Sequence, residues 1–136
     1  MNKKGFTLVE LLVVITILGI LVLIAVPNII SSLNKSKSST FLSEAQSLYK
    51  SSKNVYVLDK QKGYNYVYTN DPTVVGVNTK MLDVSSRQGF YYTIRFNADG
   101  AMVEFKVKDN DHSIDISNSS GIKLKDINKN AVRTIE

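Results

Sequence analysis

An apolar run near the start of the chain limits what this sequence can fold into more than any other feature. Of the 19 residues from Leu8 to Val26, 15 are Leu, Ile or Val. A helix of about 20 apolar residues, rising 1.5 Å per residue, spans the hydrocarbon core of a bilayer. Transfer of these aliphatic side chains into the bilayer is favourable by about 5–9 kcal/mol. The run therefore predicts a membrane-spanning helix.

A single carboxylate, that of Glu10, interrupts the front of this run. An acidic residue at the centre of a membrane helix costs about 3 kcal/mol, and less near an end, so the segment still inserts. Asn2, Lys3 and Lys4 precede the run. Basic residues there favour a cytoplasmic N-terminus and an extracytoplasmic remainder of the chain.

Three simpler interpretations of the run compete. A secretory signal peptide also has a basic start and an apolar core, but Ala25-Val26-Pro27 is a poor match to a small-residue cleavage site. A plain single-pass anchor leaves Glu10 without a role. A buried helix of a soluble protein is disfavoured by the length of the run.

The residues before the run carry a more specific signal. Gly5 followed by Phe6-Thr7-Leu8-Val9-Glu10 resembles the type IV prepilin signature, also called the class III signal. The resemblance implies a leader peptide of residues 1–5 and cleavage between Gly5 and Phe6 by a prepilin peptidase. It also implies N-methylation of Phe6, a glutamate at the fifth mature position, which is Glu10, and a pilin-like fold.

The chemistry of this motif suggests a role in assembly. Cleavage before Phe6 frees an α-amine, which is cationic at neutral pH. Glu10 lies about one turn away and could pair with this amine within one chain or between two chains. In a low-dielectric helix bundle a paired charge is tolerated and an unpaired one is costly. Phe6 and Glu10 are therefore predicted to set the register of assembly, and the resemblance favours the pair between chains.

Gly19 and Pro27 are predicted to weaken the helix. Proline in a helix interior costs about 3 kcal/mol and glycine about 1 kcal/mol relative to alanine. The stretch between them should stay helical in a membrane, where unsatisfied backbone is costly, and the resemblance implies that it extends in a filament. The alternative is a proline kink without a role.

The helix is predicted to continue after Pro27 and to end between residues 57 and 62, with Gly63 as a stop signal. Its apolar stripe should cover one face of a sheet. The stripe consists of Ile30, Leu33, Phe41, Ala45, Leu48, Ser52 and Val55, flanked by Leu42, Tyr49 and Tyr56.

The rest of the chain predicts an antiparallel sheet. The strongest signal is a hairpin, FYYTIRFNADGAMVEFKVK, with its turn at residues 97–100. Ile114 and Ile116 indicate a third strand, residues 121–124 are a candidate for another, and the alternation of Tyr64, Tyr66 and Tyr68 indicates one before the hairpin. Before the turn, we expect one face of the strand to hold Phe90, Tyr92, Ile94 and Phe96. After the turn, we expect another face to hold Ala101, Val103, Phe105 and Val107.

The fold class expected from these elements is α+β, with a long N-terminal helix whose second half packs on an antiparallel sheet. We expect three regions: a leader at residues 1–5, a transmembrane and assembly helix at 6–30, and a head domain at 31–136.

Few features indicate chemistry. The chain has no cysteine, which excludes disulfides and Cys-based zinc sites. His112 is the only histidine and is expected to be a solvated loop residue. Asp109, Asp111 and Asp115 could offer oxygen ligands to calcium, but their spacing fails the EF-hand pattern, so a charged turn is favoured. We expect no enzyme activity, cofactor or metal.

The net charge is +5, and +3 without Lys3 and Lys4. That charge is too mild and too scattered to predict a nucleic-acid surface.

Two functions follow from the resemblance. The first is a structural subunit of a type IV pilus filament that serves adhesion, twitching motility or biofilm formation. The second is a pseudopilin of a type II secretion or competence DNA-uptake machine. A third hypothesis, from another class, is a single-pass protein whose exported head binds a ligand.

The implied partners are other copies of the chain, the prepilin peptidase and methyltransferase, an assembly platform and minor pilins. The implied locations are the cell membrane before assembly and a surface filament afterwards. Glu10 argues against an initiating minor subunit. The absence of a C-terminal cysteine pair fits a Gram-positive source.

Replacing Gly5 with valine should block processing, because a β-branched side chain crowds the scissile bond where glycine leaves it open. We expect the Gly5→Val chain to stay full-length and membrane-retained. Unmodified cells should yield a protein that begins at Phe6, as measured by mass spectrometry of its N-terminal peptide. A wild-type protein that begins at Met1, or after Ala25, would contradict the leader interpretation.

Overall fold

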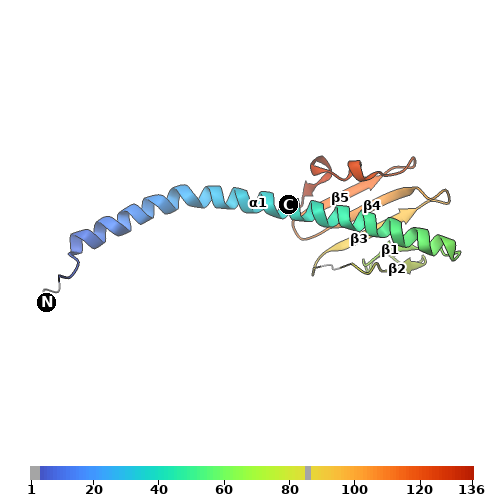
Figure 1. Cartoon of the computed structure of the whole chain (residues 1–136), viewed down its shortest axis with the longest axis horizontal. Coiled ribbons are helices and arrows are strands. Elements are labelled where there is room, and N and C mark those ends of the chain that lie inside the picture. Colours follow the sequence, from blue (N-terminus) through green and yellow to red (C-terminus); the bar gives the residue numbers. More distant parts are fainter. Residues whose placement is uncertain (1–3, 85–86) are drawn as a thin grey trace. The chain divides into compact units, whose positions relative to one another are not determined.

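A computed structural model describes residues 4–84 and 87–136 of the chain. The described elements are the helix α1 (Leu8–Gln61), the strands β1 to β6 and two 3-10 turns (Figure 1). The chain divides into two compact units, residues 1–37 and 38–136. The strands and turns, in chain order, are β1 (Val67–Thr69), β2 (Thr79–Lys80), β3 (Tyr91–Phe96), β4 (Met102–Lys108), β5 (His112–Ser117), η1 (Leu124–Asp126), η2 (Lys129–Ala131) and β6 (Arg133–Thr134).

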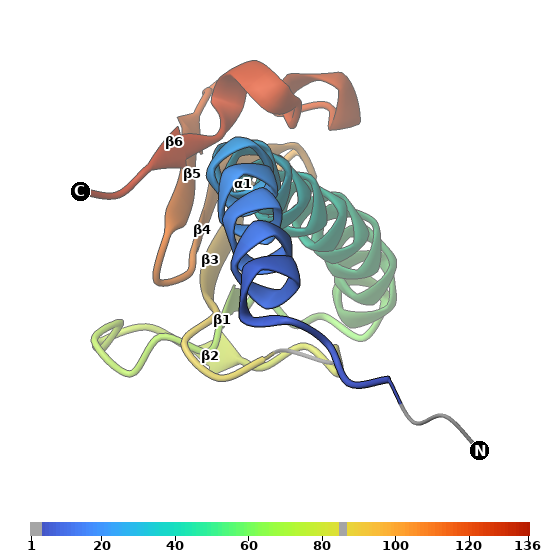
Figure 2. The same ribbon diagram turned by 90° about the vertical axis from the view of Figure 1, so that its left-hand side faces the viewer.

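In the second unit, α1 covers one face of the sheet, as Figures 1 and 2 show for its teal and green part. The ring of Phe41 meets Phe90, and that of Tyr49 meets Phe105, each edge to face with 6.2 Å between centroids. The buried residues of α1 are Phe41, Ala45, Leu48, Tyr49, Ser52, Tyr56 and Asp59.

The predicted stripe is confirmed from Phe41 onward, but two details differ. Tyr49 and Tyr56 lie within the buried face and not at its flank. Ile30 and Leu33 are exposed and belong to the first unit, so the buried stripe begins at Phe41, about three turns later than predicted.

The end of α1 is set by Gly63, as predicted. Gly63 has a φ of 82°, in the left-handed region that glycine adopts without a steric penalty. The Gly63 N–H donates to the Lys60 carbonyl at 3.0 Å, and the Tyr64 N–H donates to the Asp59 carbonyl at 2.9 Å. These two bonds form a Schellman motif, which satisfies the last helical carbonyls.

The sheet confirms the α+β class, with strand order β2-β1-β3-β4-β5-β6. All neighbours pair in antiparallel fashion except β1 and β2, which are parallel. The sheet is therefore mixed and not wholly antiparallel. The strand predicted around the three tyrosines is shorter than their alternation indicates, because β1 begins at Val67 and Tyr64 is exposed.

The hairpin forms as predicted on its β3 side, where all four expected residues are buried. Its turn is also confirmed, since Gly100 has a φ of 90° and the Gly100 N–H donates to the Asn97 carbonyl at 3.1 Å. The facing predicted for β4 is wrong for its first residues, up to Val103. Arg95 pairs with Glu104 but Phe96 pairs with Met102, so Val103 is an extra residue in a β-bulge.

A bulge changes which residues of a strand face the core, because the side chains of a strand alternate with a period of two. Met102 is therefore buried, while Ala101 and Val103 are only half-buried. Beyond the bulge, Phe105 and Val107 point into the core as expected.

The strand predicted from Ile114 and Ile116 is confirmed as β5, but residues 121–124 form no strand. The Ile122 N–H donates to the Met102 carbonyl at 2.7 Å, a single bond that closes the end of β4. The Lys123 N–H donates to Asp126 Oδ2 at 2.8 Å, which turns the chain into η1.

Two buried carboxylates tie the second unit together. Asp59 accepts hydrogen bonds from the Tyr68 hydroxyl at 2.9 Å and from Lys80 Nζ at 2.7 Å. Burial alone would raise the pKa of Asp59, but the bonds from Lys80 and Tyr68 outweigh it and hold the pKa below its ordinary value. The end of α1 is thereby bonded to β1 and β2.

The second carboxylate, Asp109, lies in the turn between β4 and β5. Its Oδ1 accepts the N–H groups of Asp111 and His112, at 2.8 and 2.6 Å. Arg87 pairs with its other oxygen and with Glu44 on α1. Burial alone would raise the pKa of Asp109, but the bonds from these two N–H groups and from Arg87 outweigh that effect and hold the pKa below its ordinary value.

A truncated chain that starts at Ser31 should be a soluble, folded α+β monomer, because it keeps the whole buried stripe without the apolar run. In it, Phe105→Ala should lower the free energy of unfolding by about 3–5 kcal/mol, because Phe105 is 0% exposed. The matched Val57→Ala change, at an exposed position, should alter it by about 0.5 kcal/mol or less. Urea unfolding followed by circular dichroism measures both. A spectrum without β signal, or equal effects of the two changes, would contradict this architecture.

Acid should destabilise this truncated chain through Asp59. Its folded pKa lies below the unfolded value, so its contribution is complete above a pH of about 4 and is lost as pH falls through the folded pKa. Asp59→Asn removes this titration, so its free energy of unfolding should fall less steeply below that pH. Equal acid slopes for Asp59→Asn and the unmodified chain would show that the carboxylate does not contribute in this way.

Candidate functional site

The candidate site is the segment that enters α1. Residues 4–7 precede the helix and are exposed, and Phe6 is 94% exposed. A Cβ added at Gly5 would meet nothing within 4 Å. The Gly5–Phe6 bond therefore lies in open, non-helical backbone that an enzyme can approach, and cleavage there stays a prediction. Met1, Asn2 and Lys3 of the predicted leader lie outside the described residues.

Glu10 has a partner that the sequence analysis missed. The Thr7 N–H donates to Glu10 Oε2 at 2.7 Å, and the Glu10 N–H donates to Thr7 Oγ1 at 3.2 Å. The helix begins at Leu8, so Thr7 is its N-cap and Glu10 its third residue. This reciprocal pair is a capping box, which satisfies two N–H groups that the first turn leaves free.

The Thr-x-x-Glu pattern ahead of an apolar run is the signal that could have predicted it. Before cleavage, Phe6 has no α-amine, and the carboxylate is held by Thr7. Cleavage would place a cation one residue before Thr7, within reach of the same carboxylate. The structure thus gives Glu10 a local partner, and its predicted pairing with the Phe6 amine stays a prediction.

The first unit exposes its apolar surface almost completely. Within α1, the most apolar window of 18 residues has a mean hydropathy of 3.1, and none of it is buried. By length and composition, α1 could cross a membrane. An apolar surface of this extent marks an interaction with lipid or with other protein chains.

Gly19 and Pro27 both lie within α1, and the helix runs through them. Proline has no N–H, so the Leu23 carbonyl receives no helical hydrogen bond. The Asn28 side chain donates to the next carbonyl, that of Ile24, at 3.3 Å. The predicted weakening at Gly19 and Pro27 stays a prediction.

His112 is not the solvated loop residue that was predicted. Its side chain is buried, and its ring stacks on Phe41 with 5.5 Å between centroids. The reason is its position at the start of β5, where the period of two places it on the same face as Ile114.

The three aspartates considered for calcium are not gathered into a site. Asp109 is buried and bonded as described above, and Asp115 is exposed on β5 opposite Lys106. Among residues 4–84 and 87–136, no three His, Asp or Glu side chains are grouped to hold a metal ion.

Comparisons with known proteins concern the N-terminal segment. Residues 1–26 match the family model of the prokaryotic N-terminal methylation motif. The chain is 42% identical to the type IV major pilin protein PilA of Myxococcus xanthus (strain DK1622) over 55 residues, which are 40% of this chain and 25% of that protein. It is 62% identical to the competence protein ComGC of Bacillus subtilis (strain 168) over 29 residues, which are 21% of this chain and 30% of that protein.

The chain thus spans 25% and 30% of the length of these two relatives. No solved structure matches.

The capping box predicts how firmly the first turn of α1 is held. Thr7→Val removes the hydroxyl that accepts the Glu10 N–H, at a cost of about 1 kcal/mol. Hydrogen exchange of the Glu10 amide, measured by NMR on the chain in detergent micelles, should become about fivefold faster. The matched Thr7→Ser chain keeps the hydroxyl and should exchange as slowly as the unmodified chain. Unchanged exchange in Thr7→Val would contradict the capping role.

Proposed function

We propose that this chain, which belongs to the type IV pilin and pseudopilin family, is a structural subunit of a type IV pilus filament. The observation that carries the proposal is the placement of Glu10. It is the only charged residue in the exposed apolar run from Leu8 to Val26, four positions after the residue that cleavage would make the N-terminus. A carboxylate there has little use in a plain anchor and a clear use in a bundle of identical helices.

Assembly would proceed through the chain's own N-terminal groups. The helix would wait in the cell membrane with its N-terminus in the cytoplasm and its head outside, until a prepilin peptidase removes residues 1–5. The Phe6 amine of one subunit would then pair with Glu10 of its neighbour, while the apolar surfaces of the helices pack together. An assembly platform and minor pilins would be the other partners. The filament would serve adhesion, twitching motility or biofilm formation.

A second candidate function is a pseudopilin of a type II secretion or competence DNA-uptake machine. The N-terminal segment is similar to the competence protein ComGC, as it is to the major pilin PilA, so these similarities do not favour the second function over the first. Both functions use the same helix and the same Glu10, so they differ in the length and abundance of the fibre. Electron microscopy of sheared surface fibres distinguishes long, abundant pili from short, sparse pseudopili.

The test of assembly is Glu10→Val in cells that carry no other copy of the gene. The change should ease membrane insertion by up to about 3 kcal/mol. In a filament it would leave the neighbour's amine buried without a partner, a loss of about 3–5 kcal/mol at every subunit. We therefore expect normal membrane content of the subunit and few or no sheared filaments.

Thr16→Val is the matched control for this experiment. It also replaces a polar residue of the apolar run by valine, and the Thr16 hydroxyl donates only to the Leu12 carbonyl of its own helix, at 2.7 Å. Filaments should be normal in Thr16→Val. Normal filaments in Glu10→Val would contradict the proposal and favour the plain anchor.

A further inference from the structure

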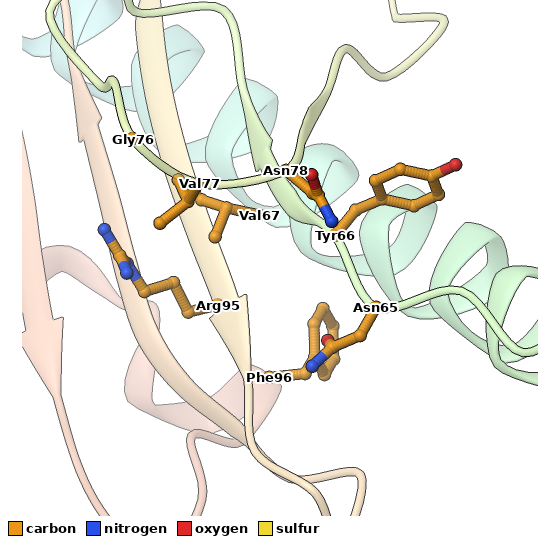
Figure 3. A pocket seen from close by; sticks show the side chains of 8 residues that line it. All are labelled: Asn65, Tyr66, Val67, Gly76, Val77, Asn78, Arg95 and Phe96. Atoms are coloured by element: carbon orange, nitrogen blue, oxygen red, sulfur yellow. The ribbon is translucent and has the colours of Figure 1, made fainter.

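A polar pocket lies in the second unit. It lies between β1, β3 and the loop that leads into β2, and its volume is about 640 Å³. Small-molecule sites in proteins have volumes of about 300–1,000 Å³. The pocket is shown in Figure 3, and the residues that line it are Asn65, Tyr66, Val67, Gly76, Val77, Asn78, Arg95 and Phe96.

Arg95 is the only charged residue in this lining. Its Nε lies 2.6 Å from Glu104 Oε2 and is shielded from solvent, but it makes no hydrogen bond within the described residues, and its side chain is 42% exposed. The exposed part is therefore elsewhere on the side chain, while the ion pair restrains the guanidinium. A guanidinium held in place in this way is suited to bind a carboxylate through two parallel N–H donors.

Glu104 is shared between Arg95 and a second cation. Lys106 Nζ lies 2.9 Å from Glu104 Oε1, so this carboxylate faces two cations. Asp115 is opposite Lys106 on β5, one strand further from the pocket. The four side chains carry no net charge together, so Arg95 offers a ligand the N–H donors of its exposed guanidinium and not a net positive surface.

Two amides supply neutral polar groups. In the part of the chain that the structure describes, neither the Asn65 nor the Asn78 side chain has a hydrogen-bond partner. The Asn78 carbonyl accepts the Val67 N–H at 2.8 Å, which fixes the backbone that presents its amide. In Figure 3 these two amides lie on one side of the pocket and the Arg95 guanidinium on the other, with Val67 and Val77 between them.

We propose that this pocket binds an acidic sugar, meaning a ring with several hydroxyls and one carboxylate. Each amide can both donate to and accept from a hydroxyl, which is itself a donor and an acceptor. Arg95 takes the carboxylate, and Val67 and Val77 cover the apolar face of the ring, since Phe96 is stacked on Tyr56 in the core. A small anion such as acetate would reach Arg95 alone, and a neutral sugar would leave Arg95 unused.

The site is built from one chain, so its test needs no filament. The full chain, labelled with ¹⁵N in detergent micelles, is titrated with D-glucuronate while the side-chain amide signals of Asn65 and Asn78 are followed by NMR. Glucose and acetate are the matched probes, since each offers half of the ligand's chemistry. We expect saturable shifts with glucuronate and affinities at least about tenfold lower for the other two.

Three variants locate the binding. Arg95→Gln should weaken glucuronate binding about tenfold or more, and Arg133→Gln, on β6 outside the pocket, should leave it unchanged. Asn78→Asp keeps the size of the side chain but adds a charge that repels the carboxylate, so it should also weaken binding. If Arg95→Gln does not fold, as judged from its backbone amide spectrum, Asn78→Asp decides alone.

The proposal is overturned if glucuronate gives no saturable shift, if glucose or acetate binds as well, or if Asn78→Asp binds it unchanged. Methyl glucuronide, which imitates the end of a glycan, identifies the source of the ligand. Binding equal to that of glucuronate supports a site for glycan ends, and much weaker binding supports a site for the free acidic sugar.

Discussion

The Glu10 carboxylate needs a partner wherever α1 is buried in lipid or among other helices, and the proposed assembly of subunits depends on that need. In the structure the partner is the Thr7 N–H, through a capping box that needs only the chain itself. A carboxylate held in this way would enter a membrane with a hydrogen-bond donor beside it, but without a countercharge. Cleavage before Phe6 would add a cation beside the same carboxylate, and only then would a second subunit be able to compete for it. The capping box and the proposed register pair would thus be two uses of one side chain, before and after processing.

α1 serves two kinds of packing. Its first part exposes aliphatic side chains that find no partner within their own unit. Its second part is one layer of an α+β unit, held by aromatic contacts with β3 and β4 and by Asp59 at its end. Because the core of that second unit is formed within the unit, we expect it to fold without assembly. The first part, in contrast, gains by burial in lipid or among other helices.

The sequence predicts those features that depend on local patterns. A continuous apolar run predicts the first part of α1 and hydrophobic periodicity the second, Gly63 predicts its end, and Asp99-Gly100 predicts the hairpin turn. The capping box was equally local and could have been predicted from Thr7 and Glu10. The bulge at Val103 leaves no such pattern, because a single extra residue changes the facing of a strand without glycine or proline to mark it.

Features that depend on tertiary contacts could not be predicted. The parallel pairing of β1 with β2 depends on the path of the loop between them. The burial of His112 depends on Phe41, which is far away in the sequence. The pocket at Arg95 unites three segments, and none of them has a motif of its own.

A cryo-electron microscopy map of the assembled fibre at side-chain resolution would test directly whether Phe6 and Glu10 pair between subunits. We expect the Phe6 nitrogen of one subunit to lie about 3 Å from a Glu10 oxygen of its neighbour, the distance of a charge-assisted hydrogen bond. A map in which Glu10 remains bonded only to Thr7 of its own chain, with the neighbour's amine elsewhere, would contradict it.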